Sequence, residues 1–192
     1  MASTIFVDKV DPQSGTALEI GSSGDTMTVP SGATLAIASG ATITNSGTAT
    51  GFGETNTPAF MVKKNDSQTV SDATWTTLTW ETEVFDTDNT FASNRFTPAV
   101  AGKYLLCVFV YAYSDGGSLE GTGIGLKFLK NGSAEGYTYL PSTSDGQTGV
   151  FFSRVVESDT DDYFDAQVNI NVNGGTPTAN DQAFFYGYKL IT

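Results

Sequence analysis

The stretch FTPAVAGKYLLCVFVYAYS, residues 96–114, decides the fold of this chain. Residues 104–113 carry no charge and are rich in aromatic and β-branched side chains, which is the composition of a β-strand. An ordinary half-buried strand alternates apolar and polar residues, whereas this stretch is apolar at both alternating sets of positions. We therefore expect one face to pack on a second sheet and the other to meet a neighbouring subunit. A central strand covered by loops of the same chain is the alternative.

The composition excludes several classes of function. The 192 residues include 9 basic and 21 acidic ones, for a net charge of -12, and such a surface repels phosphate backbones, so no nucleic acid partner is expected. No run of about 18 apolar residues is present, so membrane insertion is not expected either. The absence of histidine removes the commonest general base and the commonest zinc ligand. Helix formers are scarce and no segment has a period of 3.6 residues, so we expect an all-β protein.

A short repeat occupies the N-terminal third of the chain. Ser-Gly pairs begin at residues 23, 31, 39 and 46, and the fifth position of the first three units is apolar, as Met27, Leu35 and Ile43. One chain of such units cannot bury its apolar edge, whereas several chains wound together can. We therefore expect a narrow β-rod in which three copies share an axis. A flexible linker rich in Ser, Gly and Thr is the alternative.

The pattern along the chain predicts three parts. Residues 1–22 form an attachment segment, residues 23–56 form the rod and a hinge, and residues 57–192 form a β-sandwich or jelly roll. In the last part, ten short strands are separated by Gly, Pro, Asn and Asp. Their expected ranges are 59–63, 76–78, 81–85, 95–96, 104–113, 124–130, 136–139, 150–156, 163–172 and 183–191. Asn131-Gly132 predicts a type I′ hairpin turn, because both residues tolerate a positive φ.

Five motifs in this last part, taken in order, resemble the C1q-like domain of the C1q/tumour-necrosis-factor superfamily. They are Phe60 near the domain start, Phe96-x-Pro98-x(3)-Gly102-x-Tyr104, Leu126-x-Phe128-x-Lys130-Asn131-Gly132, the acidic turn 158–162, and Phe185-Tyr186-Gly187-Tyr188-Lys189-Leu190. The resemblance covers about residues 57–192 and implies a ten-strand jelly roll that assembles as a compact homotrimer. A trimer axis would account for the second apolar face of residues 104–113. The residues expected at the trimer interface are Met27, Leu35, Ile43, Tyr104, Leu106, Val108, Val110, Tyr186 and Tyr188.

The N-terminal part resembles a different class of protein. KVD followed by a Gly turn, then SGDT-x-x-VPSGAT and NSGTATGFG, resembles the start of tail-fibre and other virion structural proteins of marine tailed phages. The Gly-X-Y period of the collagen stem in animal C1q proteins is absent. Together the two resemblances imply a trimeric appendage on the virion surface, joined to other virion proteins through its N-terminus: a head fibre, a capsid decoration or a short tail fibre. A cellular secreted or surface C1q-like ligand is the alternative.

Two sets of residues are candidate binding sites. Aromatic faces stack on sugars, and a trimer would convert weak contacts with host surface glycans into avidity. The glycan-binding candidates are Trp75, Trp80, Tyr137 and Tyr139. Acidic loops offer the oxygen ligands that calcium prefers, although solvated turns are the favoured interpretation. The calcium candidates are Asp86, Asp88, Asp159, Asp161 and Asp162, and no other cofactor is expected.

The sequence does not predict an enzyme. A glycosidase needs two carboxyl groups at a defined separation, and nothing here singles out one pair among many. A polysaccharide depolymerase is therefore kept only as a lesser alternative.

Overall fold

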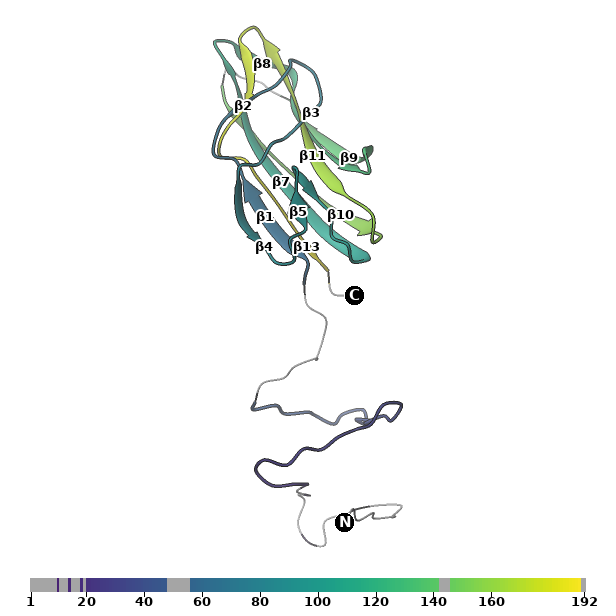
Figure 1. The fold of residues 1–192 in the computed structure, drawn as a ribbon. Helices are drawn as coiled ribbons and strands as arrows, with labels where there is room; N and C mark the ends of the chain where they lie inside the picture. Colours follow the sequence, from purple (N-terminus) through teal and green to yellow (C-terminus); the bar gives the residue numbers. More distant parts are fainter. Residues whose placement is uncertain are drawn as a thin grey trace. The chain divides into compact units, whose positions relative to one another are not determined.

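Residues 102–115 form the strand at the centre of the fold. The computed structural model describes residues 10, 14, 18, 20–47, 56–141 and 146–190, and in it β7 (Gly102–Asp115) extends the predicted strand at both ends (Figure 1). The chain divides into two units, Met1–Thr50 and Gly51–Thr192. All secondary structure assigned in the described residues is β-strand, which confirms the all-β expectation.

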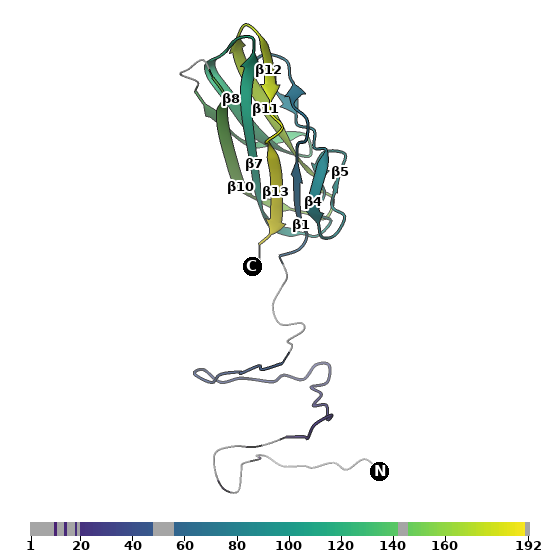
Figure 2. The same cartoon turned by 90° about the vertical axis from the view of Figure 1, so that its left-hand side faces the viewer.

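The second unit contains two antiparallel sheets. The sheet around β7, called the β7 sheet, has the order β2-β12-β7-β13-β1-β4. Strands β12 and β13 pair with successive parts of β7, and β10 pairs with β7 along its opposite edge. Its remaining strands are β1 (Ala59–Lys63), β2 (Gln68–Thr69), β4 (Thr82–Asp86), β10 (Thr148–Ser158), β12 (Thr176–Ala179) and β13 (Phe184–Lys189). Figure 2 shows β10, β7, β13, β1 and β4 side by side.

The opposing sheet, called the β11 sheet, has the order β5-β6-β11-β8-β9, and β3 also pairs with β11. Its strands are β3 (Thr76–Thr77), β5 (Phe91–Ala92), β6 (Arg95–Phe96), β8 (Ser118–Lys130), β9 (Ser133–Leu140) and β11 (Phe164–Asn173). Each of the ten predicted ranges overlaps one of these strands. The described residues form thirteen strands rather than ten, because the short strands β2, β5 and β12, of two to four residues, were not predicted.

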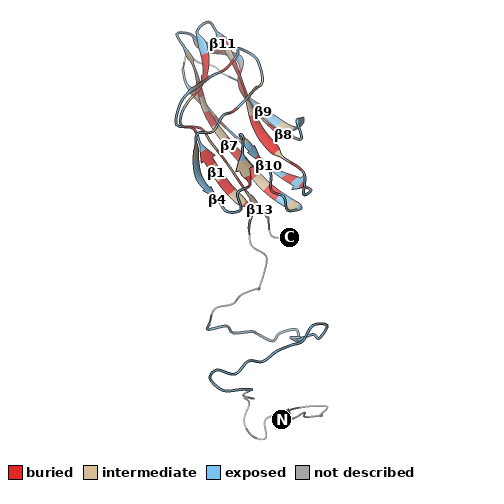
Figure 3. Cartoon of the chain, in the orientation of Figure 1, coloured by how far each residue is buried: buried red, intermediate tan, exposed pale blue. Residues whose placement is uncertain are grey.

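The core lies between the two sheets, and β7 supplies its centre. The side chains of Tyr104, Leu106, Val108 and Val110 are all fully buried, so the prediction that these four residues form a subunit interface is wrong. They face the buried side chains of the β11 sheet, and Figure 3 shows the alternation of buried and less buried positions along β7. The interface prediction chose the wrong face because both faces of this strand read as apolar.

Rings pack closely in one half of the core. Phe60 of β1 stacks on Phe96 with ring centroids 4.4 Å apart and meets Phe185 of β13 edge-on at 4.8 Å. Gly187 lies beside these rings, and a Cβ there would come within 2.6 Å of Leu106 Cδ2. A glycine at this position therefore lets β13 approach the core.

Strand β11 is buried at positions on both of its faces. Its apolar residues Phe164, Ala166, Val168, Ile170 and Val172 are buried, and so are two of the polar residues between them, Asp165 and Asn169. The outer surface of this sheet is therefore covered in places by other side chains.

The turn chemistry agrees with the sequence. Asn131 and Gly132 have φ values of 51° and 79°, which confirms the predicted hairpin between β8 and β9. Asn131 also anchors the loop that precedes β11, since its amide oxygen accepts a hydrogen bond from Tyr163 N at 3.0 Å.

The repeat in the first unit forms a series of identical turns. Backbone N–H groups of Asp25, Ala33 and Ala41 each donate at 3.0 Å to the carbonyl oxygen three residues earlier. The third residue of each turn is glycine, and these three glycines have φ between 83° and 92°, as a type II turn requires. The turns thus recur every eight residues. Residues 20–47 form no strand within the single chain, and the apolar Met27, Leu35 and Ile43 are exposed.

Within the described ranges, no helix has the length and apolar character needed to cross a bilayer.

Candidate functional site

The outward side of β7 carries large apolar side chains that no other described element covers. Phe109 lies opposite Phe151 of β10 on one side and Phe184 of β13 on the other. The Phe109 and Phe184 rings stack with centroids 5.3 Å apart. Gly149 makes room for this arrangement, since a Cβ there would lie 3.0 Å from the Phe109 ring. Three phenylalanines thus form a row across the sheet.

This row belongs to a larger, mostly apolar surface on β1, β7, β10 and β13, called the aromatic face. Its members are Met61, Leu105, Phe109, Tyr111, Phe151, Val155, Phe184, Tyr186 and Tyr188. All of them keep solvent-accessible area in the single chain, and Phe151 is 50% exposed. A contiguous exposed apolar surface on a soluble domain marks an interaction site.

Two predicted interface residues, Tyr186 and Tyr188, lie on the aromatic face. The sequence-based prediction missed Phe109, Phe151 and Phe184. The distribution of aromatic residues along β7 could have identified the outward face. Most of them occupy outward positions, while the inward positions are mostly aliphatic.

The single cysteine is enclosed beneath this face. Cys107 is 2% exposed and packs as a small hydrophobic side chain. Burial raises the pKa of its thiol, and its hydrogen bond with Tyr186 raises the pKa of that phenol to about 12. Both groups therefore stay protonated at neutral pH, and neither adds charge to the aromatic face.

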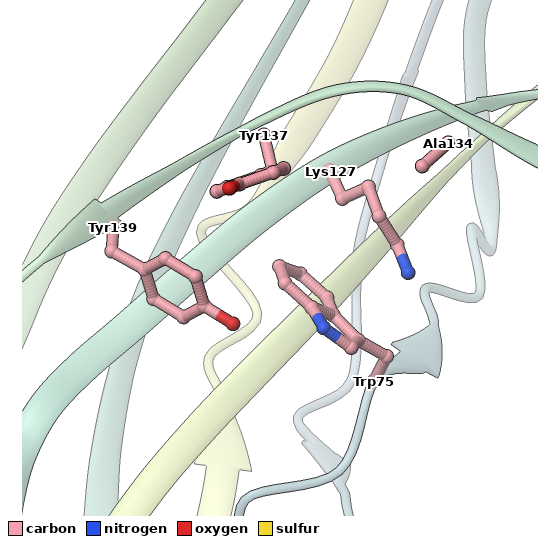
Figure 4. Close-up of a pocket in the computed structure, with 5 residues that line it drawn as sticks. All are labelled: Trp75, Lys127, Ala134, Tyr137 and Tyr139. Atoms are coloured by element: carbon pink, nitrogen blue, oxygen red, sulfur yellow. The ribbon is translucent and has the colours of Figure 1, made fainter.

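Three of the four predicted glycan-binding residues meet in one pocket on the other sheet. Trp75 precedes β3, and Tyr137 and Tyr139 lie on β9. With Lys127 of β8 and Ala134 of β9, they line an open pocket of about 300 Å³, called the indole pocket (Figure 4). The Trp75 and Tyr139 rings are 5.5 Å apart and inclined by 55°, and Tyr137 meets Tyr139 at 5.8 Å.

Lys127 brings a positive charge to the indole pocket. Its Nζ lies 4.3 Å from the centroid of a Trp75 ring, within the range of a cation–π interaction. Burial lowers the pKa of Lys127, and the nearby carboxylate of Asp165 opposes that shift. Sequence analysis missed Lys127, because an isolated lysine in a strand gives no sign of the indole above it.

Trp80, the fourth predicted glycan-binding residue, does not line the indole pocket. It is partly buried and packs against the core, with its ring 5.9 Å from the ring of Phe185. Its backbone N–H donates to Asn94 Oδ1 at 2.9 Å. The indole Nε1 is buried and has no hydrogen-bond partner among the described residues. Trp80 is therefore separated from the other three predicted glycan-binding residues.

An internal ion pair and internal hydrogen bonds close the acidic loop 159–162. Asp162 pairs with Lys130 Nζ at 2.7 Å and accepts hydrogen bonds from Asn131 Nδ2 and Asp159 N, both at 2.6 Å. The hydrogen bond from Lys130 lowers the pKa of Asp162. Asp159 and Asp161 are exposed. Asp162, one of the five calcium candidates, thus already has protein partners.

The acidic loop that begins at Asp86 is also closed by hydrogen bonds within the chain. Asp86 accepts hydrogen bonds from Thr90 Oγ1 at 2.9 Å and from Phe91 N at 2.7 Å, and Asp88 accepts one from Thr87 Oγ1. Nowhere in the described ranges do three acidic, histidine or cysteine side chains gather as a metal site requires. The calcium assignment of Asp86, Asp88, Asp159, Asp161 and Asp162 therefore stays a prediction, and the internal hydrogen bonds of Asp86 and Asp162 agree with the alternative of ordinary turns.

Comparison with known proteins identifies the fold. No family model and no curated protein sequence matches this chain. Among solved structures, the globular domain of zebrafish complement 1qA protein matches with a TM-score of 0.53 at 15% identity, over 69% of this chain and 96% of that one. A crystal structure of murine APRIL at pH 5.0 matches with a TM-score of 0.51 at 14% identity, over 69% and 98% of the two chains. The matched part of the chain has a C1q/TNF-like jelly-roll fold.

The loop geometry yields a testable prediction for Lys130→Met. We expect this change to lower the free energy of unfolding at neutral pH by about 1–3 kcal/mol, because Asp162 stays buried without its cation. The pKa of Asp162 is lowered from 3.8, so the pair stabilises the fold above that pH and its contribution is lost as the pH falls through the lowered pKa. The variant should therefore lose less stability on acidification than the wild type. Urea unfolding at a series of pH values measures both effects.

Lys103→Met is the matched control, because this lysine of β7 is exposed and its loss should change stability by less than about 0.5 kcal/mol. Parallel acid slopes for Lys130→Met and the wild type would contradict the role given to the pair. A rise in the melting temperature of the wild type on addition of calcium chloride would support the calcium interpretation.

Proposed function

We propose that this chain is a structural protein of a phage virion that forms a homotrimeric surface appendage and displays residues 57–192 for weak adhesion to host glycans. The observation that carries the proposal is the aromatic face. Its nine apolar side chains spread over four neighbouring strands, and the described part of the chain offers nothing to cover them. Covering such a face with further copies of the same chain would remove it from water.

The C1q/TNF-like fold supports three as the number of copies, in line with the trimer that the resemblance in the sequence implies. The aromatic face lies on the sheet that contains both the long β7 and the C-terminal β13. Tyr186 and Tyr188 remain interface residues in this proposal. Phe109, Phe151 and Phe184 replace the four buried residues of β7 that the sequence suggested.

The repeating turns support a rod of three chains. The turns place Met27, Leu35 and Ile43 at the same phase of successive eight-residue units, and all three are exposed in the single chain. Three chains with this pattern would bury the three residues against one another around a shared axis. The stem would thereby reinforce the trimer of the globular unit.

The virion assignment rests on the resemblance of the N-terminal part to tail-fibre and virion proteins of marine tailed phages. Residues 1–22 are proposed to join the other virion proteins, and nearly all of them lie outside the described residues. The location is then the virion surface, on either the capsid or the tail. The likeness in fold to C1q and APRIL favours, as a second candidate, a cellular secreted or surface ligand.

The oligomeric state tests the aromatic face. We expect light scattering to give a mass of about 61 kDa for the wild type, three times the 20.2 kDa of one chain. Phe151→Glu should reduce the mass to that of a single chain, because a charge would be buried at the centre of the interface. Its circular dichroism should stay unchanged, since Phe151 is half exposed in the single chain and does not belong to the core.

Tyr137→Glu is the control for this change, because Tyr137 is an exposed aromatic residue on the β11 sheet, outside the aromatic face. It should leave the mass at that of a trimer. A folded wild-type chain with the mass of one copy would overturn the trimeric proposal.

The rod has its own test in limited proteolysis. Thermolysin cleaves before large apolar residues, and we expect residues 20–47 of the wild type to resist it because those residues are buried between chains. Leu35→Asp should make this stretch sensitive, whereas Thr34→Asp, one position earlier and pointing to solvent in the rod, should not. Equal and rapid cleavage of all three proteins would show that the stretch is a flexible linker.

Immunogold labelling tests the virion assignment. An antibody to residues 57–192 is expected to label intact particles, at the capsid vertices or along the tail. Label confined to host cells would contradict the virion role and support the cellular ligand.

A further inference from the structure

The indole pocket lies at an open edge of the β11 sheet. Strand β9 is the last strand of that sheet, and no described strand pairs with its outer side. Tyr137 is 65% exposed, and Tyr139 is exposed as well. Most large aromatic side chains of the second unit lie in the core or on the aromatic face. The two tyrosines and Trp75 therefore form a separate aromatic cluster that faces solvent.

A glycine forms the floor of this cluster. Gly125 of β8 lies directly opposite Tyr139 of β9 in the ladder. A Cβ at this position would come within 2.5 Å of Tyr139 Cε1 and 2.9 Å of Trp75 Cη2. Both rings therefore lie against the backbone of β8, and the missing side chain sets their positions. This local fit holds the inclined pair of rings in place without a hydrophobic cover.

The size and shape of the indole pocket select a compact ligand with an apolar face. Its volume of about 300 Å³ is at the lower end of the range for small-molecule sites, so it suits a single ring rather than an extended chain. Figure 4 shows Trp75 between Tyr139 on one side and Lys127 on the other, with Tyr137 next to both. The C–H face of a pyranose stacks on such rings, while phenol and indole groups offer hydrogen bonds to its hydroxyls.

Charge narrows the class of sugar. Lys127 is the only charged residue in the lining of the pocket, and it forms no ion pair with any described residue. Its ammonium group lies over the indole of Trp75, 4.3 Å from the ring centroid. The chain as a whole has a net charge of -12, so a local cation is needed for an anionic ligand to approach.

We propose that the indole pocket binds an acidic sugar, a pyranose ring that carries a carboxylate. The ring stacks on Trp75 and Tyr139, and the carboxylate pairs with Lys127 Nζ. This inference rests on the proposed adhesive function and names its ligand class. Three pockets on one trimer would then bind a host polysaccharide rich in such sugars by avidity.

The experiment compares matched monosaccharides on the full-length chain. Methyl glucuronide and methyl glucoside differ only at C6, as do methyl galacturonide and methyl galactoside. In a Trp80→Phe background, Trp75 is the single indole reporter, and we expect saturable quenching of its fluorescence by at least one uronide at millimolar concentration. Each such uronide should bind at least tenfold more tightly than its neutral partner, and the difference should shrink at high salt. Saturation-transfer NMR on the wild-type chain gives a readout independent of the reporter.

Three variants separate the contributions to binding. Lys127→Met should reduce uronide affinity about tenfold, to that of the neutral sugar, whereas Lys103→Met, at an exposed lysine of β7, should leave it unchanged. Gly125→Ala should weaken both kinds of sugar, because the rings are displaced. Failure of both uronides to bind, equal binding of acidic and neutral sugars, or tighter binding of a short aspartate-rich peptide would each overturn the proposal. None of these results would alter the trimer mass or the virion labelling, so the two proposals fail separately.

Discussion

Strand β7 must remove two apolar faces from water, and the rest of the globular unit follows from that requirement. The β11 sheet covers one face and buries Tyr104, Leu106 and Val110 completely. The strands on either side of β7 extend the other face into a surface of rings rather than covering it. Hydrophobic burial at the first face supplies the core of the fold, while the second face remains available to bind a further apolar surface.

Glycines and internal ion pairs determine which surfaces are free to bind. Gly149 and Gly125 lie beneath aromatic rings on the two outer surfaces of the sandwich, where a side chain would push those rings away. The acidic turns show the opposite behaviour, because Asp162 is already paired with Lys130 and with backbone and amide donors. The exposed rings of the domain therefore lie over bare backbone, whereas the carboxylate of Asp162 already has partners within the chain.

The local sequence pattern predicted where the strands lie. It did not predict side-chain environments that depend on residues distant in the sequence. The alternation in β11 and the Asn131-Gly132 turn depend on adjacent residues, so both were predictable. Trp75 and Trp80 are only five residues apart and look equivalent in the sequence. Trp80 packs on Phe185, whereas Trp75 lies on Gly125, and both partners are more than forty residues away along the chain. The outward face of β7 likewise depends on which strands flank it, and pairing across the sheet is not visible in local periodicity.

The eight-residue turns of the first unit make its length modular. Each turn is closed by one backbone hydrogen bond within four residues, so a unit depends little on how many others precede it. Insertion or deletion of a whole unit would keep Leu35 and its equivalents in phase, whereas any other insertion would shift every later apolar residue out of line. Evolution could therefore adjust the reach of this spacer in fixed increments by duplicating a single unit, without altering the globular unit that it carries.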